Sequence, residues 1–180
     1  STAGTTSVTV NQTPAAPTAG SNSPVCAGNT LSLTASSTGT SYNWSGPNSF
    51  ISTLQNPTIA GVTTSASVTY SFTASNNGFT STVGTTSVTV NQIPSAPTAS
   101  SNSPVNAGNT LSLSASTIVG ATYSWLGGTF ASSLQNPTIA SVTTANAVCY
   151  SVTATVNGCT SSAAITCVTV VTLSITTSTN

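Results

Sequence analysis

Residues 17–36 read PTAGSNSPVCAGNTLSLTAS and residues 97–116 read PTASSNSPVNAGNTLSLSAS, so the same phrase returns 80 positions later. Within LSLTAS at 31–36, apolar and polar residues alternate strictly. An alternation with period two is typical of a strand that is buried on one face only. The phrase therefore predicts a half-buried antiparallel strand that occurs once in each of two repeats.

Other phrases return with nearly the same offset, which marks a repeat architecture. LQNPTIAGVTT from Leu54 returns as LQNPTIASVTT from Leu134, and Trp44 corresponds to Trp125. TTSVTVNQ stands at 5–12 and again at 85–92, and an altered copy, ITCVTV, begins at Ile165. We expect the following division: 1–12 as the final strand of a preceding repeat or a donated strand, 17–92 as repeat 1, 97–172 as repeat 2, and 173–180 as a tail.

The opening segment 1–12 carries the last strand of a repeat without the earlier strands of that repeat. Two interpretations stay open. The chain is an excerpt of a longer array, or the segment is donated to a neighbouring subunit, as in known cases of β-augmentation.

The rest of each repeat reads as strand, turn, strand. Apolar residues alternate with Ser and Thr again in YSFTAS at 70–75 and in SVTV at 87–90. Turn signals punctuate these runs at AGN (27–29), SGPN (45–48), NNG (76–78) and NG (157–158). No stretch has a helical period. About seven short strands in a repeat of this length predict a two-sheet sandwich.

The position of Trp44 between the expected strands favours an immunoglobulin-like version of the sandwich. In such domains a core Trp packs beside an inter-sheet disulfide, and here Leu33 and Phe72 would take the place of the two cysteines. The predicted fold class is therefore all-β, with tandem immunoglobulin-like antiparallel β-sandwich repeats. The expected core markers are Leu33, Trp44, Tyr70 and Phe72 in repeat 1, and Leu113, Trp125, Tyr150 and Val152 in repeat 2.

The chain contains no Asp, Glu, Lys, Arg or His, whereas an ordinary domain is about a quarter charged. General acid–base catalysis needs a side chain that exchanges a proton near the working pH, and a Ser or Thr nucleophile needs a base beside it. We therefore expect no catalytic residues and no enzyme.

The same composition excludes several ligands. Nucleic-acid affinity comes from Lys and Arg at phosphates, and calcium sites depend on carboxylates. Zinc would need clustered Cys or His, but the four cysteines show no C-x-x-C spacing. No apolar run reaches the roughly 18 residues of a membrane helix. We expect no metal, no cofactor, no nucleic acid and no membrane insertion.

A chain without net charge lacks the mutual repulsion that keeps proteins apart in solution. Its uncharged faces, dense in Ser and Thr, are suited to packing against copies of itself or against adjacent repeats. The joints NQTPAAPT (11–18) and NQIPSAPT (91–98) each carry two prolines and no glycine, which favours extended, fairly stiff connections. We expect folding and assembly to change little between about pH 4 and pH 9.

The phrases PVCAGNTLSLTAS, YNWSGPNSF, LQNPTIAGVTT and TTSVTVNQ resemble the Ig-like/PKD-like tandem repeats of large Bacteroidetes cell-surface proteins. Those repeats are similar to the ones in gliding-type adhesins exported by type IX secretion. The resemblance covers nearly the whole chain. It implies an extracellular or cell-surface location and a spacer, adhesive or filament role, and it brings no catalytic residues.

The cysteines depart from that family. Its repeats carry one Cys in the PVCAG phrase and one in a VNGCTS phrase, and the resemblance implies that the two pair. Here repeat 1 has Cys26 but Phe79 at the second position, and repeat 2 has Asn106 at the first position but Cys159 at the second.

Cys149 and Cys167 lie on the two strands that flank the NG turn of repeat 2, nearly opposite one another. They form either a cross-strand disulfide or a pair of free buried thiols.

Three functions remain from the sequence. The first is a structural or adhesive segment that acts as shaft or spacer and self-assembles. The second is a module that binds a glycan or a protein through aromatic rings, with Phe50 and Phe130 as the ligand-facing residues; such rings otherwise cover the ends of a core. The third is an accessory domain of a larger secreted enzyme.

Overall fold

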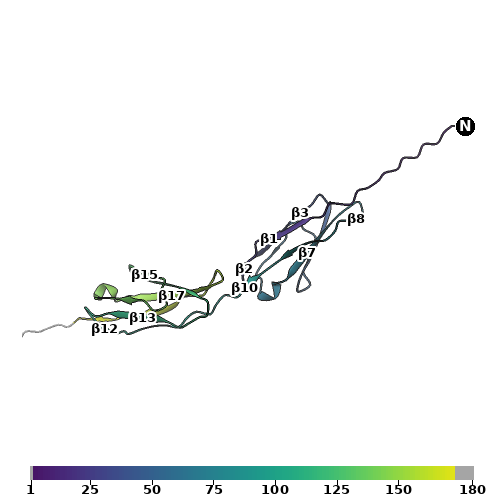
Figure 1. The fold of residues 1–180 in the computed structure, drawn as a ribbon. Coiled ribbons are helices and arrows are strands. Elements are labelled where there is room, and N and C mark those ends of the chain that lie inside the picture. Colours follow the sequence, from purple (N-terminus) through teal and green to yellow (C-terminus); the bar gives the residue numbers. More distant parts are fainter. Residues whose placement is uncertain (1, 173–180) are drawn as a thin grey trace, which may run out of the picture. The chain divides into compact units, whose positions relative to one another are not determined.

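The computed structural model describes residues 2–172 and divides the chain into two compact units, with the boundary between Gln92 and Ile93. The tail expected at 173–180 lies outside the described residues. Each unit is built almost entirely of short strands (Figure 1).

In the first unit, three strands form one layer in the order β1-β3-β6, and five form the other in the order β5-β4-β7-β8, with β9 pairing β7. All pairs in these layers are antiparallel, and β10 also pairs with β2 in parallel. The elements are β1 (Thr18–Ser21), β2 (Val25–Cys26), β3 (Leu31–Ser36), β4 (Ser41–Ser45), β5 (Ile51–Ser52), β6 (Thr58–Ile59), the 3-10 helix η1 (Thr64–Ala66), β7 (Thr69–Asn76), β8 (Phe79–Thr80), β9 (Gly84–Ser87) and β10 (Val90–Asn91).

The second unit repeats this topology. Its layers run β11-β13-β16 and β15-β14-β17-β18, with β19 pairing β17 and β12 pairing β20 in parallel. The elements are β11 (Ala99–Ser101), β12 (Val105–Asn106), β13 (Leu111–Ala115), β14 (Thr122–Gly127), β15 (Phe130–Ser132), β16 (Thr138–Ile139), the 3-10 helix η2 (Thr144–Asn146), β17 (Cys149–Val156), β18 (Cys159–Thr160), β19 (Ala164–Cys167) and β20 (Val170–Val171).

Period-two alternation places the apolar side chains between the two layers. In β3, Leu31, Leu33 and Ala35 are buried while the residues between them are not. β13 of the second unit buries every other residue in the same way. Two separate hydrophobic clusters result, one in each unit.

The residues expected to mark the core lie inside it. Their exposed fractions are all 1% or less, for Leu33, Trp44, Tyr70 and Phe72 in the first unit and Leu113, Trp125, Tyr150 and Val152 in the second. The ring centroids of Trp44 and Phe72 are 4.8 Å apart. Trp44 thus packs against Phe72, one of the two apolar residues expected in place of the inter-sheet cysteines.

The phrase LQNP supplies polar groups to the edge of each core. The indole Nε1 of Trp44 donates to the backbone oxygen of Gln55 at 3.0 Å, and Gln55 Nε2 donates to the Ala35 oxygen at 2.8 Å. Asn56 Oδ1 accepts from the Ala35 backbone nitrogen at 3.0 Å. Buried polar groups need such partners, and the second unit has the same bonds around Trp125 and Gln135.

The turn between β7 and β8 shows how the sequence closes a hairpin. Asn77 and Gly78 both have positive φ, 49° and 83°. A two-residue hairpin turn with positive φ at both positions favours Asn followed by Gly. Asn157 and Gly158 do the same between β17 and β18, with φ of 49° and 79°.

Candidate functional site

Within residues 2–172, no cluster of His, Cys, Asp or Glu could hold a metal ion. None of the helices in this part of the chain has the length and apolar character that crossing a bilayer requires. The groups available for recognition are therefore hydroxyls, amides, backbone atoms and apolar side chains.

The aromatic residues expected to face a ligand lie at the margins of the two cores. Phe50 is half-buried and meets Tyr70 edge-on, with ring centroids 5.8 Å apart. Phe130 is half-buried against Tyr150 in the same geometry, at 5.9 Å. Phe79, by contrast, is 43% exposed. Because Phe50 and Phe130 pack against their core clusters, part of each ring is used for packing.

The structure joins Cys149 and Cys167 in a disulfide across β17 and β19, where the two residues are direct register partners with Cα atoms 3.9 Å apart. Both residues are exposed, so the alternative of free buried thiols is wrong for this pair. Cys26 and Cys159 are also disulfide-bonded, and no free cysteine occurs among the described residues. The corresponding pair in the first unit is Thr69 and Ser87, whose hydroxyl oxygens are 3.5 Å apart.

The outer face of the larger sheet of the first unit carries mostly neutral polar side chains, with the exposed Ile51 at its edge beside Ser45. Asn43 lies beside Thr73 on the neighbouring strand. In another row, Ser71 lies between Ser45 and Thr85. At one end of the face, Ser75 and Thr80 hydroxyls lie 2.9 Å apart. Directly opposite residues on one face of a sheet lie within contact distance, so these groups form continuous rows.

The matching row of the second unit is apolar at two positions. Leu126 is the register partner of Ser151, and Ser151 is the partner of Ile165. Leu126 is 57% exposed and Ile165 is 63% exposed. We call Leu126, Ser151 and Ile165 the outer row; it combines apolar area with a central hydroxyl.

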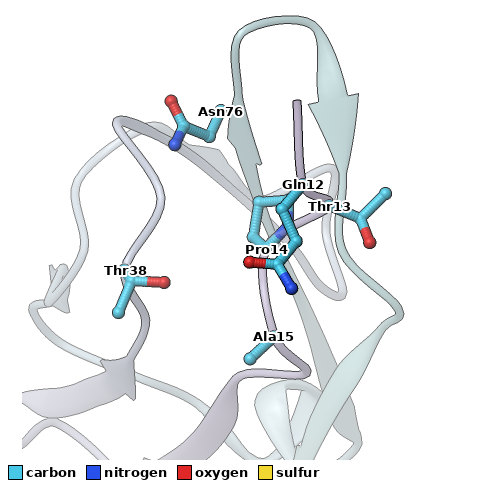
Figure 2. Close-up of a pocket in the computed structure, with 6 residues that line it drawn as sticks. All are labelled: Gln12, Thr13, Pro14, Ala15, Thr38 and Asn76. Atoms are coloured by element: carbon cyan, nitrogen blue, oxygen red, sulfur yellow. The ribbon is translucent and has the colours of Figure 1, made fainter. Parts of the chain in front are cut away.

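A shallow polar hollow of about 340 Å³ lies where the N-terminal segment enters the first unit. Figure 2 shows Gln12, Thr13, Pro14 and Ala15 on one side of it, and Thr38 and Asn76 on the other. Its side chains offer only two amides, hydroxyls and short apolar groups, so it can hold neutral polar groups but has no acid or base with which to activate one.

The N-terminal segment before this hollow is extended and pairs with no strand. Every residue from Thr2 to Thr13 is exposed, and Val8 and Val10 are exposed to 82% and 88%. The segment includes TTSVTVNQ at 5–12, which is also the sequence of residues 85–92.

Several residues of these surfaces were missed by the sequence analysis. The repetition of LQNP indicated importance but not the hydrogen bonds of Gln55 and Asn56. The outer row could have been found by comparing the repeats position by position, because Leu126 and Ile165 replace Ser and Thr on an outward face.

No protein-family description matches the chain, and no curated protein matches it in sequence. Solved structures match in fold. One is the crystal structure of Down Syndrome Cell Adhesion Molecule (DSCAM), N-terminal eight Ig domains, with TM-score 0.58 and 18% identity over 89% of this chain and 24% of that chain. Another is mouse coronavirus receptor-binding domain complexed with its murine receptor, with TM-score 0.56 and 12% identity over 86% of this chain and all of the other. At these identities the likeness establishes the fold alone: each unit of the chain is an immunoglobulin-like β-sandwich.

Proposed function

We propose that this chain is a structural and adhesive repeat segment of a secreted or cell-surface protein. It acts as shaft or spacer and associates with copies of itself or with adjacent repeats, and it does not catalyse a reaction. The observation that carries the proposal is that two closed sandwiches present only neutral side chains. Without a proton-exchanging group near neutral pH, recognition must depend on shape, hydrogen bonds and apolar contact.

The disulfides support the proposed location. Cys149 and Cys167 are exposed and bonded to each other. Disulfides form and persist in oxidising compartments and are rare in the cytosol. The resemblance of PVCAGNTLSLTAS and LQNPTIAGVTT to repeats of Bacteroidetes surface adhesins supports the finer assignment to a type IX secretion substrate.

The outer row supports association through the larger sheet of the second unit. Its two exposed apolar side chains flank one hydroxyl in the middle of a face that carries no charge. Exposed apolar groups rimmed by polar residues mark interaction sites on soluble proteins. The partners we propose are therefore neutral protein surfaces, with a second copy of this face first among them.

Sedimentation of the full chain at low and high salt tests this function. We expect concentration-dependent association that is the same at about 10 mM and about 1 M NaCl, because no charges are present to be screened. Leu126→Lys with Ile165→Lys should abolish it. Thr34→Lys with Ser112→Lys, which adds the same charge to the smaller sheets, is the matched control and should weaken it far less.

Equal loss in both charged variants would assign the effect to net charge and not to the outer row. A chain that stays monomeric at every concentration but is retained by a glycan or protein surface would favour the binding-module alternative. Phe50 and Phe130 give that alternative limited support, because both rings are half-buried against tyrosines.

A further inference from the structure

One octapeptide, TTSVTVNQ, occupies two different environments in this chain. At 85–92 it supplies the last strands of the first unit, and Val88 and Val90 are 4% and 5% exposed. At 5–12 it is unpaired, and the corresponding Val8 and Val10 are more than four-fifths exposed. The same side chains are thus core residues in one copy and surface residues in the other.

The buried copy is held along its whole length. Its first part, in β9, pairs with β7, and its last part, in β10, pairs with β2. Between them, Val88 N donates to the Val68 oxygen at 3.0 Å, and Val90 N donates to the Ser67 hydroxyl at 2.7 Å. We call residues 85–92 the closing strand.

The related sequence in the second unit is used in the same way. β19 pairs with β17, and Val168 is 6% exposed with its backbone nitrogen donating to the Val148 oxygen at 3.0 Å. Two of the three copies therefore close a sandwich, which indicates the environment that the third copy fits.

The first unit cannot accept residues 5–12 itself. Its closing strand directly follows Gly84, which lies against Pro17 so closely that an added Cβ would be 2.5 Å from the Pro17 oxygen. The strand ends beside Cys26. Gln12 would have to sit where Gln92 sits, about 26 Å along the strand from Gly84. The five steps from Gln12 to Pro17 span at most about 18 Å.

We propose that residues 5–12 are a donor strand that completes a separate immunoglobulin-like unit of this repeat type, one that lacks its own closing strand. The segment pairs with that unit's equivalent of β7 and places Val8 and Val10 in its core. This inference deepens the proposed function, on which it rests, by naming the partner as an open sandwich equivalent to residues 17–81.

Disulfide trapping tests both the pairing and its register. Cys149 and Cys167 form a disulfide in the second unit, and the equivalent residues of the first unit are Thr69 and Ser87. Ser7 holds the position in residues 5–12 that Ser87 holds in residues 85–92. The acceptor is the full chain with Val88→Ser and Val90→Ser, to loosen its own closing strand, and with Thr69→Cys. The donor is a synthetic peptide of residues 1–16 with Ser7→Cys.

We expect the Ser7→Cys peptide to be trapped on the acceptor roughly tenfold more than a Thr5→Cys peptide, because Thr5 would pair near Ser71 and bridging fails beyond about 7 Å between Cα atoms. Peptides that also carry Val8→Ser and Val10→Ser should not be trapped. If the double serine acceptor does not fold, an acceptor with Val88→Ala alone loosens the strand less and takes its place.

Equal trapping of the Thr5→Cys and Ser7→Cys peptides, or trapping of neither on a folded acceptor, would overturn the proposal. Neither result would affect the salt-independent association through the outer row. The donor-strand proposal can therefore be wrong while the proposed function stands, and the reverse. After positive trapping, peptide mapping of the native protein identifies the source of the acceptor: an open unit directly upstream in the same polypeptide, or a unit of another chain.

Discussion

Glycine at position 46 leaves the space that the ring of Tyr70 occupies. A Cβ built on Gly46 would lie 2.4 Å from Tyr70 Cδ1, and one built on Gly127 would lie 2.4 Å from the same atom of Tyr150. Both tyrosines are 1% exposed, so both rings are packed inside their cores. At the scale of single residues, packing around these rings decides which substitutions each unit tolerates.

Gly46→Ala should destabilise the first unit by about 1–3 kcal/mol, because the added methyl overpacks the Tyr70 ring. Urea unfolding followed by tryptophan fluorescence measures the change. Gly4→Ala is the matched control, since nothing lies within 4 Å of a Cβ at that position. A variant as stable as the original chain would show that Tyr70 can shift without cost.

Gln55→Ala should cost the first unit about 1–2 kcal/mol. The substitution removes the 2.8 Å bond to the Ala35 oxygen and leaves that part-buried acceptor without its donor. Leu54→Ala, at a side chain that is 65% exposed, should change stability by less than about 0.5 kcal/mol. Hydrogen exchange at the amides of β3 gives the difference, and equal protection in both variants would contradict the role of Gln55.

At the scale of elements, the alternation of apolar and polar residues was sufficient to predict the main strands. LSLTAS and YSFTAS each lie in a single strand with the expected face buried, and the Asn-Gly turns lie where expected. The parallel pairing of β2 with β10 was not predicted, because two-residue pairings depend on tertiary contacts and carry no period. The outer row was also not predicted, because the sequence was not compared repeat against repeat at the outward positions, where Leu126 and Ile165 replace Ser45 and Thr85.

The Cys149–Cys167 disulfide is a difference between the paired strands β17 and β19 of the second unit and their counterparts β7 and β9 in the first. It closes a loop with a sequence separation of 18 residues, whereas the first unit has Thr69 and Ser87 at these positions. Cys149→Ser with Cys167→Ser should destabilise the second unit by about 3 kcal/mol, chiefly by freeing its unfolded chain. The first unit serves as internal control, and differential scanning calorimetry should show its transition unchanged.

For the whole molecule, the absence of charged side chains determines the response to pH. The chain has no Asp, Glu, His, Lys or Arg, and its described cysteines are in disulfides. Tyrosine is then the only side chain in the described part of the chain whose titration matters. Burial raises the pKa of the Tyr70 hydroxyl above the ordinary 10.0, because desolvation penalises the phenolate.

The free energy of unfolding should therefore stay constant between about pH 4 and pH 9 and fall above about pH 10. The sign follows from the raised pKa in the folded state: the unfolded chain releases the Tyr70 proton first, so alkaline pH favours unfolding. Thermal melts across this pH range measure the change in stability. Tyr70→Phe is the control, and it should reduce the loss of stability at alkaline pH. A steep transition between pH 4 and pH 9 would contradict the prediction.

The cross-strand disulfide between Cys149 and Cys167 also has a mechanical consequence. When a unit is pulled apart by its ends, the residues inside a disulfide loop stay slack and contribute no length. The loop of 18 residues removes roughly 60 Å from the extension that the second unit would otherwise release, whereas Thr69 and Ser87 close no such loop in the first unit. Reduction of the Cys149–Cys167 bond should therefore lengthen the step that the second unit gives on a force-extension trace.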